Sequence, residues 1–215
     1  MSRALVVTGT DTGIGKTVVA AALVAMLDAD YWKPVQSGLE GESDSDTVRR
    51  LAGIDPARIH AEAYRLAQPL SPHRAAELDG VVIDTSRLIP PPSSRVLIIE
   101  GAGGLMVPMT RAVLQIDVFA RWRLPIVLVA PTRLGCINHT LMSVEALKAR
   151  GMPITAIIFS GEENADSQRT ILDFSRIPSA GRLPTLSPLD GNTLRHAASH
   201  HLDMTPLHRA LEAAT

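Results

Sequence analysis

The feature that most constrains this fold is a glycine-rich stretch near the start of the chain, with the sequence Val6-Val7-Thr8-Gly9-Thr10-Asp11-Thr12-Gly13-Ile14-Gly15-Lys16-Thr17. It begins within an apolar run at residues 4–7, which predicts a buried strand. It ends at the start of an alanine-rich apolar segment, which predicts a helix. A strand, a glycine-rich turn and a helix in this order favour anion binding, because backbone N–H groups and the helix N-terminus attract negative charge. The stretch therefore predicts a phosphate-binding loop.

The residue types in this loop suggest specific roles. Lys16 would reach the β- and γ-phosphates of a nucleotide, and the Thr17 hydroxyl would be a ligand of Mg²⁺. We expect the nucleotide to contact Asp11, Thr12, Gly13, Ile14, Gly15, Lys16, Thr17 and Val18. The spacing departs from the usual loop, because Gly9 and Gly15 enclose five residues and Thr10 occupies the place of the first glycine. A glycine-rich turn without a ligand is the alternative.

A second strong signal lies at residues 95–104. Four apolar residues lead into Glu100, which is followed by the glycine-rich sequence Gly101-Ala102-Gly103-Gly104. This pattern predicts a buried parallel strand that delivers a carboxylate to the C-terminal edge of a sheet. In P-loop proteins an acid at that edge holds Mg²⁺ directly or through water. The alternative role of Glu100 is to cap the following loop.

An acidic run at residues 40–46 precedes a predicted helix at residues 47–52. Its aspartates and serines are typical of a helix N-terminus. Hard cations prefer oxygen ligands, so one of these carboxylates could also complete the magnesium site.

The remaining chain alternates predicted strands and helices. We predict a strand that ends in a loop at residues 31–38, further strands at residues 126–130, 154–159 and 180–183, and helices at residues 138–149, about 161–174 and from 190 onward. Near-continuous apolar strands between helices are typical of an α/β fold with a mostly parallel sheet and helices on both faces. We expect residues 1–215 to form a single P-loop NTPase-like domain.

Composition argues against several classes of partner. A net charge of −1 and an aromatic content of 3% do not favour binding to nucleic acid or to an anionic membrane. The single cysteine, Cys136, excludes an intrachain disulfide and a cysteine-rich metal site. The longest apolar stretch, at residues 18–27, is about half a membrane span, and we expect no leader segment and a cytoplasmic protein. His196 and His200 have the i, i+4 spacing of a metal pair, but a solvated helix face explains them better.

Several motifs together resemble the dethiobiotin synthetase family, in the order in which that family carries them. These are the loop Gly9-Thr10-Asp11-Thr12, then Lys33-Pro34-Val35-Gln36-Ser37-Gly38, Ser71-Pro72-His73, Glu100-Gly101-Ala102-Gly103-Gly104 and Leu134-Gly135-Cys136-Ile137-Asn138-His139. The resemblance implies an enzyme that carboxylates 7,8-diaminononanoate with CO₂ or bicarbonate and closes the cyclic urea at the expense of ATP. Mg²⁺ is the implied cofactor. The reaction needs positioning and charge neutralisation more than acid–base groups.

The same resemblance implies roles for individual residues. Catalysis would depend on Lys33, Lys16, Thr12 and Ser37, whose side chains would face the carbamate and the transferring phosphate. The metal ligands would be Thr17, Asp46 and Glu100, with Asp44 as the alternative to Asp46 because both follow a serine. The diamine would contact Lys33, Ser37, Ser71, Pro72, Gly103, Cys136, Ile137 and Asn138. Amides at the last three positions would bind the substrate carboxylate across the interface of a homodimer.

At the predicted nucleotide-binding residues Ser160 and Gly161 the chain departs from the family pattern. Several dethiobiotin synthetases place an asparagine here, whose amide can pair with the adenine edge. Ser160 has one hydroxyl and Gly161 has no side chain, so we expect the base to be recognised weakly. Asn164, a few residues later, is the possible substitute.

Two other functions remain open. A partitioning-type switch ATPase shares the fold, but such proteins carry an additional lysine early in the loop, where this chain has Thr10-Asp11-Thr12. A carboxylate-activating amidotransferase domain is the weaker alternative, since it is ordinarily joined to a glutaminase.

Overall fold

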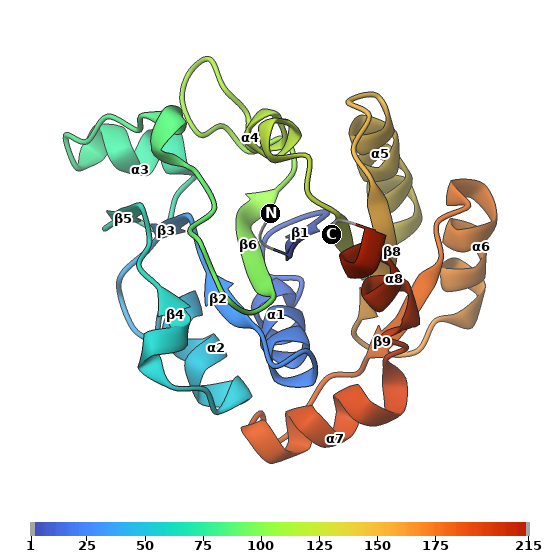
Figure 1. Cartoon of the computed structure of the whole chain (residues 1–215). Coiled ribbons are helices and arrows are strands. Elements are labelled where there is room, and N and C mark those ends of the chain that lie inside the picture. Colours follow the sequence, from blue (N-terminus) through green and yellow to red (C-terminus); the bar gives the residue numbers. More distant parts are fainter. Residues whose placement is uncertain (1–2, 214–215) are drawn as a thin grey trace.

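The computed structural model describes residues 3–213 and has a seven-stranded sheet at its centre (Figure 1). Its strands are β1 (Ala4–Gly9), β2 (Asp30–Trp32), β4 (Ile59–His60), β6 (Leu97–Gly104), β7 (Ile126–Pro131), β8 (Ile154–Ser160) and β9 (Ser179–Leu183). They lie in the order β4-β2-β6-β1-β7-β8-β9, and all neighbours are parallel. A small parallel pair joins β3 (Val35–Ser37) to β5 (Tyr64–Leu66).

Helices connect these strands. The α-helices are α1 (Lys16–Met26), α2 (Asp44–Ala52), α3 (Pro72–Leu78), α4 (Gln115–Trp122), α5 (Cys136–Lys148), α6 (Ala165–Ser175), α7 (Gly191–His201) and α8 (Thr205–Ala213). Short 3₁₀ helices, η1 (Pro56–Arg58) and η2 (Thr85–Arg87), lie in the connections. Within the described part of the chain, no helix combines the length and apolarity that crossing a bilayer requires.

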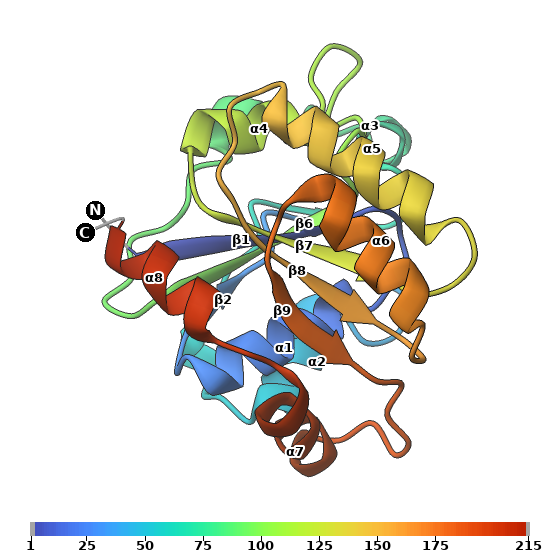
Figure 2. The same ribbon diagram turned by 90° about the vertical axis from the view of Figure 1, so that its right-hand side faces the viewer.

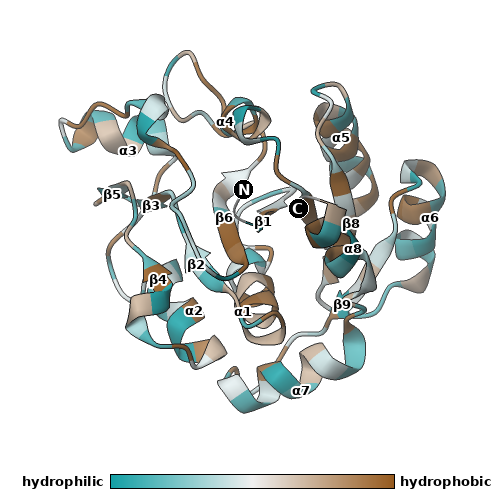
Figure 3. Cartoon of the chain, viewed as in Figure 1, coloured by the Kyte–Doolittle hydropathy of each residue, from teal (hydrophilic) through white to brown (hydrophobic). Residues whose placement is uncertain are grey.

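The helices cover both faces of the sheet (Figure 2). Successive side chains of a strand point to opposite faces, and β1 divides accordingly. Leu5 and Val7 join the core beneath α1 and α7, whereas Ala4 and Val6 join the core on the side of α4. Hydrophobic colour is concentrated on α1 and β6 at the centre, and α7 at the lower edge is mostly hydrophilic (Figure 3). Burial on both faces explains why the strands are almost continuously apolar.

The predicted fold class is confirmed, and the element boundaries differ in places. The strand expected through Lys33 and Pro34 is wrong as one element. It divides there into β2 of the main sheet and β3 of the small sheet, because proline has no N–H to donate to a ladder. The second helix begins at Asp44 rather than at residue 47. Elements β4, β5 and α4 were not predicted, and the helix expected from residue 190 onward is divided into α7 and α8.

Parallel strands end at a common edge of the sheet, and this edge gathers the sequence motifs. The loops that follow β1, β2, β6, β7, β8 and β9 all leave from it. Open α/β sheets bind ligands outside this carboxyl edge, at the point where the strand order reverses. Here the order reverses around β1, which lies between β6 and β7.

Candidate active site

The loop between β1 and α1 has the backbone of an anion-binding turn. Gly13 and Gly15 adopt left-handed conformations, with φ of 69° and 89°. A Cβ on Gly15 would lie 2.5 Å from Ser160 Oγ, so both the conformation and the space require glycine there. No side chain caps the start of α1. The first amides of the helix therefore remain available to an anion, as expected for a phosphate site.

Lys16 is the cation of this loop. Its side chain folds back so that Nζ donates to the backbone oxygen of Asp11 at 2.5 Å, and the residue is 7% exposed. Burial lowers the pKa of Lys16 to about 8, because it disfavours the charged ammonium more than the carboxylates of Glu100 and Asp44 favour it. A bound phosphate would reverse this balance by supplying a close negative charge.

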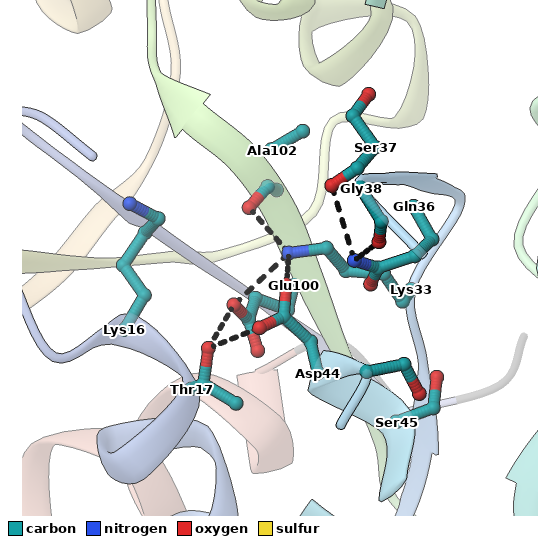
Figure 4. Close-up of polar contacts among 12 residues, drawn as sticks. Lys16, Thr17, Lys33, Gln36, Ser37, Gly38, Asp44, Ser45, Glu100 and Ala102 are labelled. Carbon is teal, nitrogen blue, oxygen red and sulfur yellow. Dashed lines mark hydrogen bonds and ion pairs between the residues drawn. The ribbon is translucent and has the colours of Figure 1, made fainter. Parts of the chain in front are cut away.

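Three oxygen-bearing side chains from separate elements converge beside the loop (Figure 4). Thr17 Oγ1 lies 2.9 Å from Asp44 Oδ1 and 2.9 Å from Glu100 Oε1. The threonine hydroxyl has one proton and can donate to only one of these carboxylates at a time. The cluster is therefore rich in oxygen lone pairs, which are the ligands that Mg²⁺ prefers. The residues present thus fit a magnesium site.

Lys33, the residue that directly follows β2, completes this cluster. Its Nζ lies 2.6 Å from Asp44 Oδ2 and 3.0 Å from Glu100 Oε1, and it donates to the Gly101 carbonyl at 3.2 Å. Lys33 is 3% exposed. Burial favours the neutral amine, but the two carboxylates outweigh it and raise the pKa of Lys33 above its usual value. Lys33 is therefore a permanent cation within this cluster.

Tyr31 contacts the same carboxylate from the interior. Its hydroxyl donates to Glu100 Oε2 at 2.8 Å. Burial and the adjacent Glu100 charge raise the pKa of Tyr31 well above its usual value, so the hydroxyl keeps its proton. Sequence reasoning did not identify Tyr31, because a tyrosine within a buried strand looks like ordinary core.

The structure places Asp44 in the cluster in place of the favoured Asp46. Asp46 lies on the outer face of α2, where its carboxylate accepts from Ser43 Oγ at 2.7 Å and lies 3.7 Å from Arg49 Nη2. Ser43 caps this helix by accepting from the Asp46 amide. Helix periodicity explains the difference, because Asp44 shares the i, i+4 row with buried Val48 and Asp46 does not. That apolar row was the signal that could have chosen between the two aspartates.

Six of the residues predicted to face the carbamate or the diamine line one cavity of about 420 Å³, and Lys16 is not among them. Its walls include Thr12, Lys33, Ser37, Ser71, Pro72 and Gly103. Ser37 Oγ is buried and has no hydrogen-bond partner within residues 3–213, so it is available to a ligand. Ser71 precedes α3 without capping it through its side chain, and its hydroxyl lies 3.0 Å from His73 Nδ1. Ser71 still occupies the N-cap position of α3, and Pro72 follows it in the first turn.

The predicted residues at the start of α5 are not part of this cavity. Cys136 is 4% exposed and packs in the core with Leu128 and Phe159. Asn138 is exposed, and α5 begins after Gly135 without a side-chain cap. An adjacent surface cavity of about 480 Å³ joins Thr12 to residues of α5, including Met142.

A larger open cleft of about 650 Å³ adjoins the other side of the phosphate loop. Gly13, Ile14, Gly15, Val18, Ser160 and Gly161 line it, as expected for nucleotide-binding residues. Apart from Asn164, sequence reasoning missed the rest of its wall, which comprises residues 131–134 at the end of β7, 162–164 after β8, and 183–186 and 189 at and after the end of β9. Their positions at the carboxyl ends of predicted strands were the available signal.

The chain is similar to several known proteins over most of its length. The family model described as "AAA domain" matches residues 3–193. The ATP-dependent dethiobiotin synthetase BioD of Rhodopseudomonas palustris (strain HaA2) is 55% identical over 203 residues, which cover 94% of this chain and 95% of that protein. The protein of the same name from Agrobacterium fabrum is 53% identical over 204 residues, covering 95% and 96%.

Solved structures resemble the chain at the level of the fold. The septum site-determining protein MinD of Pyrococcus horikoshii OT3, complexed with Mg-ADP, has a TM-score of 0.53 and 13% identity, covering 93% of this chain and 96% of that one. Cyanthece apo McdA has a TM-score of 0.53 and 17% identity, covering 99% and 97%. At these identities the likeness extends to the fold alone.

Proposed function

Because the chain belongs to the dethiobiotin synthetase family, we propose that the Lys33 cluster and the adjoining phosphate loop form the catalytic site of that family's reaction. The protein is an ATP-dependent ligase of biotin biosynthesis, which carboxylates 7,8-diaminononanoate with CO₂ and closes the ring to dethiobiotin, releasing ADP and phosphate. The observation that most supports the site is the convergence of Lys33, Asp44 and Glu100, because Lys33 and Asp44 also line the diamine cavity.

In our proposal the triphosphate binds along the start of α1. The amides of the first helical turn and the Lys16 ammonium neutralise its charge, and the base lies in the cleft between β7, β8 and β9. Lys16 now donates to the Asp11 carbonyl, an exchangeable partner that a phosphate oxygen can replace.

Thr17, Asp44 and Glu100 are the side chains that would hold Mg²⁺. The ion would supply positive charge that offsets the negative charge of the phosphates. This assignment takes Asp44 in place of Asp46, on the strength of the 2.9 Å contact with Thr17.

Lys33, Thr12 and Ser37 would act on the reacting groups. CO₂ first adds to one amine of the substrate to form a carbamate. A carbamate oxygen then attacks the γ-phosphorus and ADP leaves, and the second amine attacks the carbonyl carbon of the resulting anhydride and expels phosphate. Lys33 would neutralise the carbamate and the transferring phosphoryl group, while the Thr12 and Ser37 hydroxyls orient their oxygens.

We further propose that the active protein is a two-fold homodimer. Asn138 is exposed at the start of α5 and is not among the residues that line its own chain's diamine cavity, which supports a role in a neighbour's site. Met106 and Met142, which are 54% and 61% exposed, line the surface cavity beside Thr12. A partner chain that covered these methionines would place its own α5 near the diamine.

The test is to mix the protein with the diamine, bicarbonate and MgATP, and to identify the product by mass. We expect the cyclic urea, with one ADP formed for each ring closed. ATP turnover that is indifferent to the diamine would contradict this function and favour the switch ATPase, whose fold the chain shares.

A further inference from the structure

The two oxygens of the Glu100 carboxylate have different surroundings. Oε1 faces the site, where Thr17 Oγ1 lies at 2.9 Å and Lys33 Nζ at 3.0 Å. Oε2 faces the interior and accepts from the Tyr31 hydroxyl at 2.8 Å. Glu100 is 1% exposed, so water does not substitute for these contacts.

Strand register accounts for the contact with Tyr31. β2 and β6 are parallel neighbours, with Tyr31 opposite Ile98. Glu100 is two residues beyond Ile98 and therefore points to the same face of the sheet. Tyr31 is fully buried in the core with Ile98, so its ring cannot move away from the carboxylate.

A hydrogen bond to one oxygen fixes the rotation of the whole carboxylate. Without a donor at Oε2, the group could turn about its terminal bond, which has a broad energy profile. It could then present its oxygens to Thr17 and Lys33 in other ways. Hydrogen-bond partners behind a metal ligand set its orientation in the same manner.

We propose that Tyr31 is a positioning residue that holds Glu100 so that Oε1 faces the cation of the nucleotide complex. Tyr31 would not itself touch the metal or the nucleotide, and would act only through Glu100. This inference rests on the magnesium site of the proposed function. The competing explanation is that Tyr31 merely satisfies a buried carboxylate and contributes to stability alone.

The variant Tyr31→Phe removes only the hydroxyl, and the chain offers a matched control. Tyr64 is the other tyrosine, 7% exposed, and its hydroxyl is also hydrogen-bonded, to the backbone of Asp84 at 2.9 Å. It is not among the residues that line the cavities on either side of the phosphate loop. Tyr64→Phe therefore reproduces the loss of a buried hydroxyl away from Glu100.

The measurement is ATP affinity by calorimetry, once in EDTA and once in saturating Mg²⁺. For Tyr31→Phe we expect the affinity in EDTA to be unchanged and the gain produced by Mg²⁺ to fall by about tenfold to a hundredfold, the usual cost of losing a partner behind a metal ligand. Tyr64→Phe should keep the full increase in ATP affinity that Mg²⁺ produces. Mn²⁺ binding to the ATP complex, followed by its paramagnetic resonance, should weaken in parallel in Tyr31→Phe alone.

A double-mutant cycle with Glu100→Gln tests whether the effect passes through the carboxylate. If it does, Tyr31→Phe should not reduce the Mg²⁺ gain further in the Glu100→Gln background. A Tyr31→Phe protein with a lower melting temperature but the full Mg²⁺ gain would overturn the inference. So would an equal loss in the Tyr64→Phe control.

If Tyr31→Phe does not fold, the parent protein still decides the question. Adding Mg²⁺ to the ATP complex should shift the near-ultraviolet tyrosine absorption, and the shift should persist in Tyr64→Phe. No shift in either protein would overturn the inference. Diamine-independent ATP turnover would instead overturn the proposed function and leave the coupling between Tyr31 and the metal standing.

Discussion

Lys16 carries the charge of the phosphate loop, and its burial lowers its pKa to about 8 from the usual 10.5. Below this pKa the ammonium is present and can bind phosphate. Above it the free protein loses the proton, so binding ATP must take a proton up. We expect ATP affinity to be steady below pH 8 and to weaken above it by at most about tenfold per pH unit.

Calorimetry in buffers of different ionisation enthalpy checks this prediction, because it counts the protons taken up on binding. The absence of proton uptake near pH 9 would contradict the lowered pKa of Lys16. The same shift also affects folding. Between about pH 8 and pH 10.5 the native Lys16 binds fewer protons than the unfolded one, so its destabilising effect is complete below that window and is relieved as the pH rises through it.

Lys33 is expected to act on the chemical step more than on nucleotide binding, because it lines the diamine cavity and not the nucleotide cleft. Lys33→Ala should lower kcat by about 10²–10³-fold, the usual effect of losing one electrostatic donor, with a smaller change in ATP affinity. Steady-state kinetics and calorimetry measure the two quantities. Lys148→Ala is the control, since Lys148 binds the Ser175 carbonyl at 2.8 Å at a remote site. A Lys33→Ala enzyme with nearly the parental kcat would show that Lys33 has no role in the chemical step.

Asp44 and Asp46 form a natural pair of variants on one helix. Asp44→Asn should weaken the Mg²⁺-dependent part of ATP binding, because it removes a carboxylate beside Thr17. Asp46→Asn should leave that binding intact and lower stability by no more than about 1 kcal/mol, because its partners are the cap Ser43 and exposed Arg49. Magnesium titrations and thermal melts of both proteins test this. If Asp46→Asn, and not Asp44→Asn, weakened the Mg²⁺-dependent binding, Asp46 would be the metal ligand.

Single residues were predictable where their type and position left few choices. Lys16, Thr17 and Glu100 lie at one sheet edge, as expected from their positions at a helix start and near a strand end. Asp44 and Asp46 could not be separated by motif, since each follows a serine, and only the buried face of α2 distinguishes them. Tyr31 could not be predicted, because its partner lies on a strand 69 residues later in the chain.

At the scale of elements, Asn138 is exposed in the first turn of α5, where the substrate carboxylate is expected to bind. Asn138→Ala should weaken diamine binding and leave ATP affinity unchanged, if this turn completes a partner's site. Substrate KM and ATP affinity separate these effects, and light scattering gives the assembly state. His139→Ala, one residue on and also exposed, is a control for general disturbance of the helix. A fully active monomer at the same concentration would contradict the shared site.

Elements with strong periodicity or clear stops were predicted to within a few residues. β7, β8 and α5 followed from apolar runs bounded by glycine and proline. Short elements such as β4 and β5 have too few residues for any pattern, and they form because the main sheet and β3 offer them partners. The break at Pro34 was visible in the sequence, but only the tertiary fold assigns β2 and β3 to different sheets.

At the scale of the whole molecule, the nucleotide cleft is built from the ends of three strands that are far apart in sequence. Its wall near the expected base comes from the segments after β7, β8 and β9. The sequence predicted that Ser160 and Gly161 could not read adenine as an asparagine would. The structure adds that the Gly161 carbonyl and the Asn164 side chain already form hydrogen bonds within the protein.

Ser160 lines the cleft beside Gly15 of the phosphate loop, and its single hydroxyl cannot make both bonds of an amide. Gly161 has φ of 119°, and its carbonyl accepts from Arg182 at 2.9 Å. Asn164, the possible substitute, caps α6 instead by accepting from the Ser167 amide at 3.1 Å. Its Nδ2 donates to the Thr132 carbonyl at 3.4 Å, so both ends of this side-chain amide already have partners within the protein.

We therefore predict that this enzyme binds the triphosphate firmly through the Lys16 loop but discriminates poorly among bases, so that CTP and GTP replace ATP with modest loss. A bidentate amide pair is worth roughly 1–3 kcal/mol of discrimination, and its absence limits selectivity accordingly. Comparing kcat/KM for the four nucleoside triphosphates measures this, and Asn164→Ala should leave the ranking unchanged. A preference for ATP beyond about a thousandfold exceeds what such a site allows. It would assign base recognition to other residues of the cleft, with Glu163 and Arg133 the first to replace.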